Sequence, residues 1–589
     1  MDIFSVFTLL GGLALFLYGM NVMGAGLDKV AGGRLERILE KLTSNPIKSV
    51  FLGALVTAVI QSSSATTVMV VGFVNSGIMK LSNAVGIIMG ANLGTTATAW
   101  ILSLSGLEGD SFFVKIFKPS SFSPILAFIG IILFMVSKRD RKKDIGIILI
   151  GFAILMTGME SMSGAVKPLA DVPGFRNILV MFSNPLLGVL TGAVLTAIIQ
   201  SSSASVGILQ AISITGGLTY SAAIPIIMGQ NIGTCITAIL SGIGASKNAR
   251  RASLVHLYFN LIGTIAFLAV FYTIQYTIGF PFINDSVDAV SIAIVHTLFN
   301  LFSTAVLLPF SKGLEKLACL TIKDKEEKGK EDDLDAIHGL DERFLASPSF
   351  AVDQCIDLTK QMATLAKDTL LASIRLMEHY DEEAAKEIIA CEDKIDKYED
   401  IIGTYLVKLS SKSLSENDSK SVSVSLHVIG DLERIGDHAV NIKEVAKEMH
   451  QKKIVFSPEA QEELKVMTSA ITDVLTQTIL AFETNNLDLC KQIEPLEEVV
   501  DTLRKELKDR HIRRLQSGNC TTELGFIYSD ILTNYERVSD HCSNIAVCLL
   551  QVEENSFETH GYMHDIKYAK DNTFNQQYEK VKTKYKLPM

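Results

Sequence analysis

Two short polar segments interrupt the apolar first half of this 589-residue chain. The first is Gln61–Ser64, and the second, with the same letters QSSS, is Gln200–Ser203. The apolar arms on either side of the first, 50–60 and 65–79, are each shorter than the ~17–25 residues that a helix needs to span a bilayer. We therefore expect each segment to be the tip of a broken or hairpin membrane helix that faces protein or a water-filled cavity. Interrupted apolar segments at matching positions of two halves indicate the binding site of a transporter.

The chain around these segments repeats itself with one constant offset, that from Gln61 to Gln200, and no gap. Such a constant offset over a long stretch indicates a duplicated structural unit, not two unrelated apolar stretches. The matching positions are Gly12 and Gly151, Gly19 and Gly158, Ser44–Pro46 and Ser183–Pro185, Asn92 and Asn231, and Thr95 and Thr234.

The loop charges tell how the two copies are related. The loop 29–48 is basic, whereas its counterpart 168–187 has only Arg176; the loop 108–112 is acidic, whereas 247–251 is basic. Because cytoplasmic loops carry an excess of Lys and Arg, the exchange predicts an inverted repeat whose hairpins enter from opposite sides. We expect seven full spans plus two re-entrant hairpins, with the N-terminus outside and the C-terminus inside.

Charge also divides the chain into two parts. Residues 1–310 carry a net +6 and residues 311–589 a net −16. This predicts a membrane domain in the lipid bilayer followed by an acidic, soluble, helical one, which argues against a nucleic-acid partner. The expected fold class is all-α, with membrane repeat 1 at 1–143, repeat 2 and the final spans at 144–310, a charged linker at 311–348, a cytoplasmic helical bundle at 349–550 and a tail at 551–589.

The polar segments can bind ions without formal charge. The interiors of the expected spans lack Asp, Glu, Lys and Arg, so an anion would be held by hydroxyls, backbone N–H groups and half-helix N-termini. Neutral oxygens suit a hard cation such as sodium, which would supply the missing positive charge. The alternative is that the serines only cap the helices or pack the hairpins closely. The candidate residues are Gln61, Ser62, Ser63 and Ser64 with Gln200, Ser201, Ser202 and Ser203.

Two further polar patterns lie on the spans. Asn92 and Thr95, and their copies Asn231 and Thr234, follow the hairpins, where binding an ion and packing behind the site are equally compatible with the pattern. The two last spans share the pattern H-x-x-F-N, for which hydrogen bonding between helices is the favoured interpretation. Its residues are His256 and Asn260, and His296 and Asn300.

The soluble part also contains a duplicated motif, E-R-x-x-D-H-x-x-N-I. Its carboxylates are spaced i,i+4 on one helix face: Glu433 and Asp437 in the first copy, Glu536 and Asp540 in the second. Like charges at this spacing repel each other unless a cation is bound, so the motif predicts a divalent-metal site. A solvated acidic face balanced by the adjacent arginines is the alternative. Two copies of a three-helix unit would account for the repeat.

Residues 1–310, with the doubled QSSS segments, the G-x-N-x-G-T helices and the H-x-x-F-N spans, resemble the bacterial sodium/phosphate cotransporter family, relatives of the type II carriers. Residues 349–550 resemble PhoU-like domains. The resemblance implies sodium-coupled movement of inorganic phosphate with both QSSS segments lining the site, and a phosphate-regulatory cytoplasmic domain with metal at Glu433, Asp437, Glu536 and Asp540. Since Asn534 replaces the Asp431 of the first copy, it also implies a weaker second metal site.

These observations predict a sodium-coupled secondary transporter of phosphate in the cytoplasmic membrane. No Walker motif, metalloprotease helix or nucleophile elbow is present, which argues against ATP-driven transport and against an enzyme. Three alternatives stay open: a phosphate exporter, a carrier of another oxyanion, and a membrane-anchored phosphate sensor.

Overall fold

The computed structural model describes residues 3–31, 38–39, 45–106, 118–323, 340–554 and 573–588. The chain forms two compact units, Met1–Ala351 and Val352–Met589. Over the described residues the secondary structure is helical, apart from an isolated bridge between Thr219 and Ser286. The predicted all-α class is confirmed.

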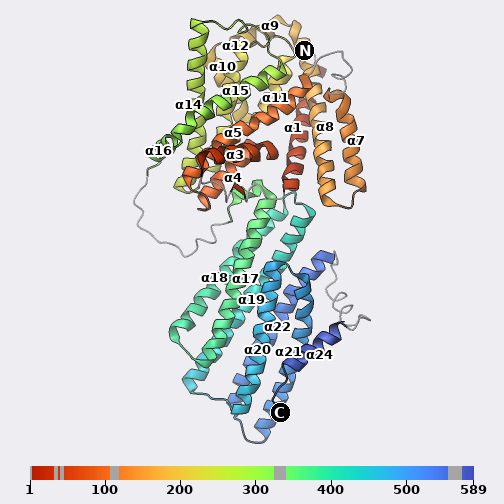
Figure 1. Cartoon of the computed structure of the whole chain (residues 1–589), viewed down its shortest axis with the longest axis vertical. Helices are drawn as coiled ribbons and strands as arrows, with labels where there is room; N and C mark the ends of the chain where they lie inside the picture. The colour runs from red at the N-terminus through yellow and green to blue at the C-terminus, as the bar shows by residue number, and fades with distance from the viewer. Residues whose placement is uncertain are drawn as a thin grey trace. The chain divides into compact units, whose positions relative to one another are not determined.

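Unit 1 contains helices of very different lengths (Figure 1). Six helical segments of the described chain are long and apolar enough to cross a membrane: α1 (Ile3–Ala31), α5 (Leu81–Ser103, continued by η1 to Gly106), α8 (Asp140–Val166), α12 with α13 (Tyr220–Gly233 and Cys235–Ser241), α14 (Lys247–Thr277) and α15 with α16 (Ala289–Leu307 and Ser311–Thr321). The shorter ones are α3 (Pro46–Ile60), α4 (Ser63–Asn75), α7 (Pro119–Val136), α9 (Pro173–Met181), α10 (Pro185–Ile199) and α11 (Ser202–Ser213). The seven expected spans therefore correspond to these six and α7, whose apolar part is shorter than a full span.

The first helices of the two repeats, α1 and α8, pack against each other through glycines. A Cβ atom built on Gly12 would lie 3.0 Å from the carbonyl oxygen of Gly158, and one on Gly19 would lie 2.8 Å from that of Gly151. Small residues of this kind let membrane helices approach closely. Because the repeat pairs Gly12 with Gly151 and Gly19 with Gly158, these crossed contacts mean that equivalent helices are antiparallel. The predicted inverted repeat is confirmed.

Each polar segment lies at the tip of a hairpin. Helix α3 runs parallel to α5, since a Cβ on Gly86 would meet the carbonyl oxygen of Pro46 at 3.0 Å and one on Gly94 would meet that of Ala54 at 2.5 Å. Because α5 starts directly after α4, α4 must return to the level at which α3 began. Glycines of α12 contact α10 in the same parallel register. Both segments are therefore re-entrant hairpins, as the sequence predicts.

The close approach of α3 to α5 gives a first prediction. A Cβ on Gly90 would lie 2.0 Å from the backbone carbonyl oxygen of Val50, whereas one on Gly11 would meet nothing within 4 Å. We expect Gly90→Ala to destabilise the protein by about 1–3 kcal/mol, the usual range for overpacking, and Gly11→Ala to be neutral. Thermal unfolding of both variants in detergent tests this; equal melting temperatures would contradict the parallel packing.

Two helical elements lie in the described residues of the segment expected to be a charged linker, 311–348. Its beginning is the helix α16, and near its end Glu342–Ala346 form a 3-10 helix, η5. In η5 and just after it, Phe344 and Phe350 are fully buried within unit 1. Lys, Arg, Asp and Glu are frequent in 311–348, so the composition of this segment does not indicate that aromatic rings at its end are buried.

Unit 2 consists of two three-helix copies, as the repeated motif predicts. The first copy is α17 (Pro348–Glu378), α18 (Glu382–Ser410) and α19 (Glu416–Lys452); the second is α20 (Pro458–Thr484), α21 (Leu487–Gln516) and α22 (Thr522–Glu554). Helix α17 begins in unit 1 and continues into unit 2. The tail, to which the sequence assigns nothing, contains α24 (Thr573–Lys584), which packs against α21.

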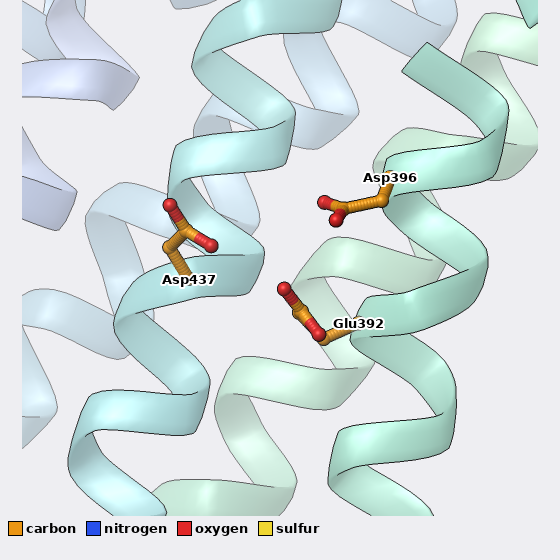
Figure 2. Close-up of side chains that lie close together, drawn as sticks. All are labelled: Glu392, Asp396 and Asp437. Atoms are coloured by element: carbon orange, nitrogen blue, oxygen red, sulfur yellow. The ribbon is translucent and has the colours of Figure 1, made fainter. Parts of the chain in front are cut away.

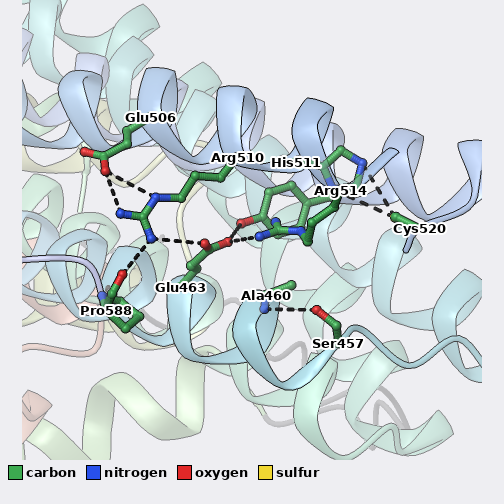
Figure 3. A network of polar contacts seen from close by, with 10 residues as sticks. Ser457, Ala460, Glu463, Glu506, Arg510, His511, Arg514, Cys520 and Pro588 are labelled. Atoms are coloured by element: carbon green, nitrogen blue, oxygen red, sulfur yellow. Dashed lines mark hydrogen bonds and ion pairs between the residues drawn. The ribbon is translucent and has the colours of Figure 1, made fainter. Parts of the chain in front are cut away.

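A buried carboxylate ties this tail into the second copy (Figure 3). Glu463 accepts hydrogen bonds from Arg514 (2.7 Å), Arg510 (3.4 Å) and the Tyr528 hydroxyl (3.2 Å). Arg510 also donates to the backbone carbonyl of Pro588 at 2.6 Å. A buried charge requires such pairing and hydrogen bonding, so the network fixes the end of the chain on α21.

Candidate functional site

The two QSSS segments adopt the same backbone conformation. Gln61 ends α3 with φ 61° and ψ 22°, and Gln200 ends α10 with φ 58° and ψ 23°. Both lie in the left-handed region, which a residue with a Cβ atom rarely adopts. Ser62 and Ser201 then cap α4 and α11, each accepting the N–H of the residue three positions ahead (3.1 and 3.2 Å). Each tip thus ends one half-helix and begins another within a few positions.

The arms of each hairpin are joined one turn from the tip. Thr57 donates to Thr66 at 3.1 Å in the first hairpin, and Thr196 donates to Ser205 at 2.9 Å in the second. Half-helix N-termini and serine hydroxyls together form a neutral surface suited to an oxyanion. Of the candidate serines, Ser63, Ser202 and Ser203 are buried, and Ser62, Ser64 and Ser201 are partly exposed.

The two glutamines differ in their surroundings. The Oε1 atom of Gln61 accepts a hydrogen bond from Thr98 of α5 at 2.9 Å, and the Gln61 side chain is buried. Thr237, the counterpart of Thr98, instead donates to the backbone carbonyl of Thr234 at 2.9 Å, and Gln200 is exposed. The glutamine of the first tip is therefore hydrogen-bonded to α5, whereas the glutamine of the second tip is exposed.

The candidate Asn and Thr side chains bond mainly to their own helices. The amide oxygens of the asparagines contact other helices: that of Asn92 lies 3.4 Å from Nε2 of His256, and that of Asn231 accepts from Nδ2 of Asn300 at 3.4 Å. The contacts of His256 and Asn300 agree with the predicted hydrogen bonding between helices and place Asn92 against α14 and Asn231 against α15. Both ring nitrogens of His296 lack a hydrogen-bond partner among the described residues. One turn back in its own helix, each side chain donates to a carbonyl: Asn92 to Ile88 (2.8 Å), Thr95 to Ala91 (3.1 Å), Asn231 to Ile227 (2.8 Å) and Thr234 to Gln230 (2.9 Å).

Two buried glutamines of the second repeat were missed by the sequence analysis. Gln210 donates to backbone carbonyls of α5 and α15 (3.1 and 2.9 Å), and Gln230 donates to one of α11 (2.9 Å). Their own carbonyl oxygens have no hydrogen-bond partner among the described residues. The repeat contained the signal, since the counterparts in the first copy are apolar, Val71 and Ala91.

A cavity of about 610 Å³ opens beside the end of α11. Lys118 and Lys167 line it together with Glu160 and Asp288, and Ile214 lies at the end of α11. Its volume is within the range of small-molecule sites. Glu160 belongs to α8, so the described spans do contain a carboxylate, near the end of a helix and not in its middle.

In unit 2, three carboxylates from two helices converge (Figure 2). Oxygens of Glu392 and Asp396 on α18 and of Asp437 on α19 lie within 4.8 Å of one another. Burial, followed by repulsion from neighbouring carboxylates, raises the pKa of Glu392, Asp396 and Glu433. Oxygen ligands at this spacing suit a hard divalent cation. The predicted Asp437 thus lies beside two carboxylates that the sequence analysis had not chosen, although their i,i+4 spacing was visible, and the predicted Glu433 is not one of the three.

The second copy is built differently. Glu536 pairs with Arg504 at 3.0 Å, and Asp540 pairs with Arg537 at 3.3 Å. By the alignment of Asp396 with Asp501, the counterpart of Arg504 in the first copy is Glu399. In the second copy Arg504 therefore balances the negative charge of Glu536. At the equivalent position of the first copy, Glu399 adds a further negative charge.

Asp431 and Asn534, which the sequence analysis linked to the metal motifs, lie instead between the two copies. Asp431 accepts from Nδ1 of His541 (2.9 Å), and the oxygen of Asn534 lies 2.8 Å from Nδ1 of His438. The two imidazole rings are 5.7 Å apart. This crossed pair joins α19 to α22, and neither Asp431 nor Asn534 belongs to the group of three carboxylates in the first copy.

Comparison with known proteins places this architecture. The family model described as Na+/Pi-cotransporter matches residues 15–164 and 154–291, and the one described as PhoU domain matches 359–446 and 464–549. The chain belongs to the Na+/Pi-cotransporter family and carries a PhoU domain in its second half. It is thus a multi-pass membrane protein of a phosphate-transporter family, which points to a transporter and not an enzyme.

Three relatives cover different parts of the chain. A protein of Escherichia coli (strain K12), described as "Putative inorganic phosphate export protein YjbB", is 25% identical over 92% of this chain and 97% of its own length. The uncharacterized protein YqeW of Bacillus subtilis (strain 168) is 30% identical over 53% of this chain and 96% of its own length. Sodium-dependent phosphate transport protein 2A of Rattus norvegicus is 26% identical over 32% of this chain and 29% of its own length.

Proposed function

We propose that this protein moves inorganic phosphate across the cytoplasmic membrane, together with sodium or in exchange for it, and that the two QSSS tips bind both ions. The observation that carries the proposal is the duplicated tip. The same rare left-handed glutamine, followed by the same serine cap, ends a half-helix in each inverted repeat. A strained backbone conformation that occurs twice is maintained where it serves a function.

The chemistry of the tips favours an anion bound beside a cation. Helices α4 and α11 contain no charged side chain, so phosphate would be held by the helix N-termini and the hydroxyls of Ser62–Ser64 and Ser201–Ser203. The glutamine oxygens and the last carbonyls of the first arms offer neutral ligands to sodium, with Asn92, Thr95, Asn231 and Thr234 packed behind them. The sodium ion would supply the positive charge that the site lacks.

The direction of net transport has two candidates. Sodium-driven uptake follows from the family description and from the sodium-dependent relative in Rattus norvegicus. Export is favoured by the Escherichia coli relative, which matches nearly the whole chain and is described as an export protein. Both directions use the same site, because an alternating-access carrier works either way according to its gradients.

Unit 2 would act as a cytoplasmic regulator. Its first copy would hold a divalent cation at Glu392, Asp396 and Asp437 with Glu433 close by, whereas Glu536 and Asp540 would remain paired with arginines. The cation would cancel the repulsion that raises the pKa values in this cluster.

Radiolabelled phosphate flux in proteoliposomes tests the proposal. We expect flux that requires sodium, is not supported by potassium and is not blocked by excess sulfate. Reversing the sodium gradient separates the directions: flux that follows the gradient supports a symporter, and flux against it supports an exporter coupled by exchange. Phosphate binding without flux in either direction would contradict a carrier and favour a sensor.

A further inference from the structure

The segment Asp341–Phe350 of unit 1 is seated against the second arm of the first hairpin. The rings of Phe344 and Phe350 pack on Phe73 of α4, with ring centroids 5.3 and 5.1 Å from it and 5.1 Å from each other. All three side chains are completely buried. Such aromatic clusters stabilise a contact beyond the apolar area they bury, so the segment is docked at this place.

Polar contacts surround the aromatic cluster. Asn75, which ends α4, donates to Asp341 at 2.7 Å. Arg343 donates to the backbone carbonyl of Ser241 at 2.7 Å, at the end of α13, and Ser347 donates to Asp28 of α1 at 3.1 Å. The segment therefore bridges α1, α4 and α13, three elements that meet at one end of the first hairpin.

The internal repeat identifies what this surface is. With the same offset that relates Gln61 to Gln200, Asp28 corresponds to Lys167 and Asn75 corresponds to Ile214. In the second repeat both of these counterparts line the open cavity of about 610 Å³. Because the repeats are inverted, the two places lie at opposite ends of the hairpin pair. The segment Asp341–Phe350 thus lies where the other half has a cavity.

The first hairpin is fitted to this segment. Gly72 faces Phe344, and a Cβ atom built on Gly72 would come within 2.8 Å of Cε1 of the ring. Its counterpart in the second hairpin is the buried Ala211. The methyl group that Gly72 lacks would occupy the space that the Phe344 ring fills.

We propose that Asp341–Phe350 is a plug that closes the route of phosphate at the first hairpin's end, whereas the equivalent place at the second hairpin's end holds the 610 Å³ cavity. The plug is covalently continuous with unit 2, because helix α17 begins inside the plug at Pro348 and continues as the first helix of that unit. The inference rests on the transport function proposed above. Undocking the plug would allow the carrier to open at the first hairpin's end in its turn of the alternating-access cycle.

Two substitutions release the plug by different means. Phe344→Ala removes the central ring, and Gly72→Ala installs the residue of the other hairpin where the ring sits. Phe128→Ala, at an exposed position of α7, is the control. We expect phosphate flux in proteoliposomes to rise about tenfold or more in the two release variants and to stay unchanged in the control, since minor states of such equilibria are typically ~0.1–10% populated.

A cross-link locks the plug. Asp28→Cys combined with Ser347→Cys places two thiols where the side-chain oxygens are 3.1 Å apart. After oxidation we expect flux to fall below the wild-type rate and to return on reduction. Docking is followed without any transport by limited trypsin cleavage after Arg343, which we expect to be slow in the wild type and fast in Phe344→Ala and Gly72→Ala.

The outcomes separate this proposal from the transport function. Unchanged flux in both release variants, with Arg343 cleaved faster, overturns the plug as a limit on flux. Equal cleavage in the wild type and the variants overturns its docking. If the wild type and every variant move no phosphate, the proposed function has failed; faster cleavage in the release variants then still supports the docked segment, and equal cleavage overturns it.

Discussion

Phosphate flux should fall by roughly ten- to a hundredfold when Gln61 or Gln200 is replaced by alanine, with insertion into the membrane unaffected. Alanine at position 61 removes the amide oxygen that we propose as a cation ligand; it also leaves the buried donor of Thr98 unsatisfied, which lowers the stability of the fold by about 1–3 kcal/mol. A tenfold change in binding corresponds to about 1.4 kcal/mol. The measurement is radiolabelled flux, normalised to the amount of protein that elutes as a single species.

Matched substitutions separate the side chain from the backbone. Gln61→Gly removes the amide but suits the left-handed conformation, so it should transport as poorly as Gln61→Ala while melting at a higher temperature. Gln200 is exposed and Thr237 bonds elsewhere, so Gln200→Ala should lose flux with a smaller change in melting temperature than Gln61→Ala. Normal flux in either alanine variant would remove the QSSS tips from the mechanism.

The membrane fold could be predicted because the two repeats of the chain can be aligned with each other. One constant offset between the two copies, combined with the exchange of loop charges, was enough to predict inverted repeats and re-entrant hairpins. The structure confirms this prediction through the crossed glycine contacts of α1 with α8 and the parallel register of α3 with α5. The offset could not show how closely helices approach, which depends on the backbone oxygen that each glycine meets.

Contacts between distant parts of the chain escaped sequence reasoning. Phe344 directly follows three charged residues and Phe350 lies in a small-residue stretch, and only the fold brings them to Phe73, which belongs to the first repeat. In unit 2 the sequence shows that the motif on α19 contains carboxylates. It does not show which carboxylates of other helices lie near them, because this depends on which helix packs beside α19. Glu392 and Asp396 come from α18. Glu399 and Arg504 occupy equivalent positions and have opposite charges. This difference could have been seen in the sequence, and it would have predicted that the acidic groups of the two copies have different surroundings.

Removing one carboxylate from the first copy should abolish the stabilisation of the protein by divalent cations, whereas the equivalent change in the second copy should have no effect. We compare Asp437→Asn with Asp540→Asn in the full-length chain, with Mg²⁺, Ca²⁺ or Mn²⁺, the ions that prefer oxygen ligands. A cation at a hundred times its Kd stabilises the folded state by about 2.7 kcal/mol. Differential scanning calorimetry should show this shift in the wild type and in Asp540→Asn, and not in Asp437→Asn.

The pH dependence of the stability distinguishes a metal site from a nonspecific salt effect, because only the metal site predicts the direction of this dependence. The pKa values of Glu392, Asp396 and Glu433 are raised in the folded state by burial and mutual repulsion. A raised carboxyl pKa stabilises the fold at low pH, and this contribution is lost as the pH rises through the folded pKa. Without metal, the stabilising contribution of this cluster should therefore shrink as the pH rises above the ordinary range of carboxyl pKa values, and the cation should stabilise the wild type more at pH 7.5, where the carboxylates are ionised. Asp437→Asn should flatten this dependence, because it removes a charge that acts on both Glu392 and Asp396. Equal metal stabilisation of Asp437→Asn and Asp540→Asn would show that the cluster in Figure 2 is a solvated acidic face and not a metal site.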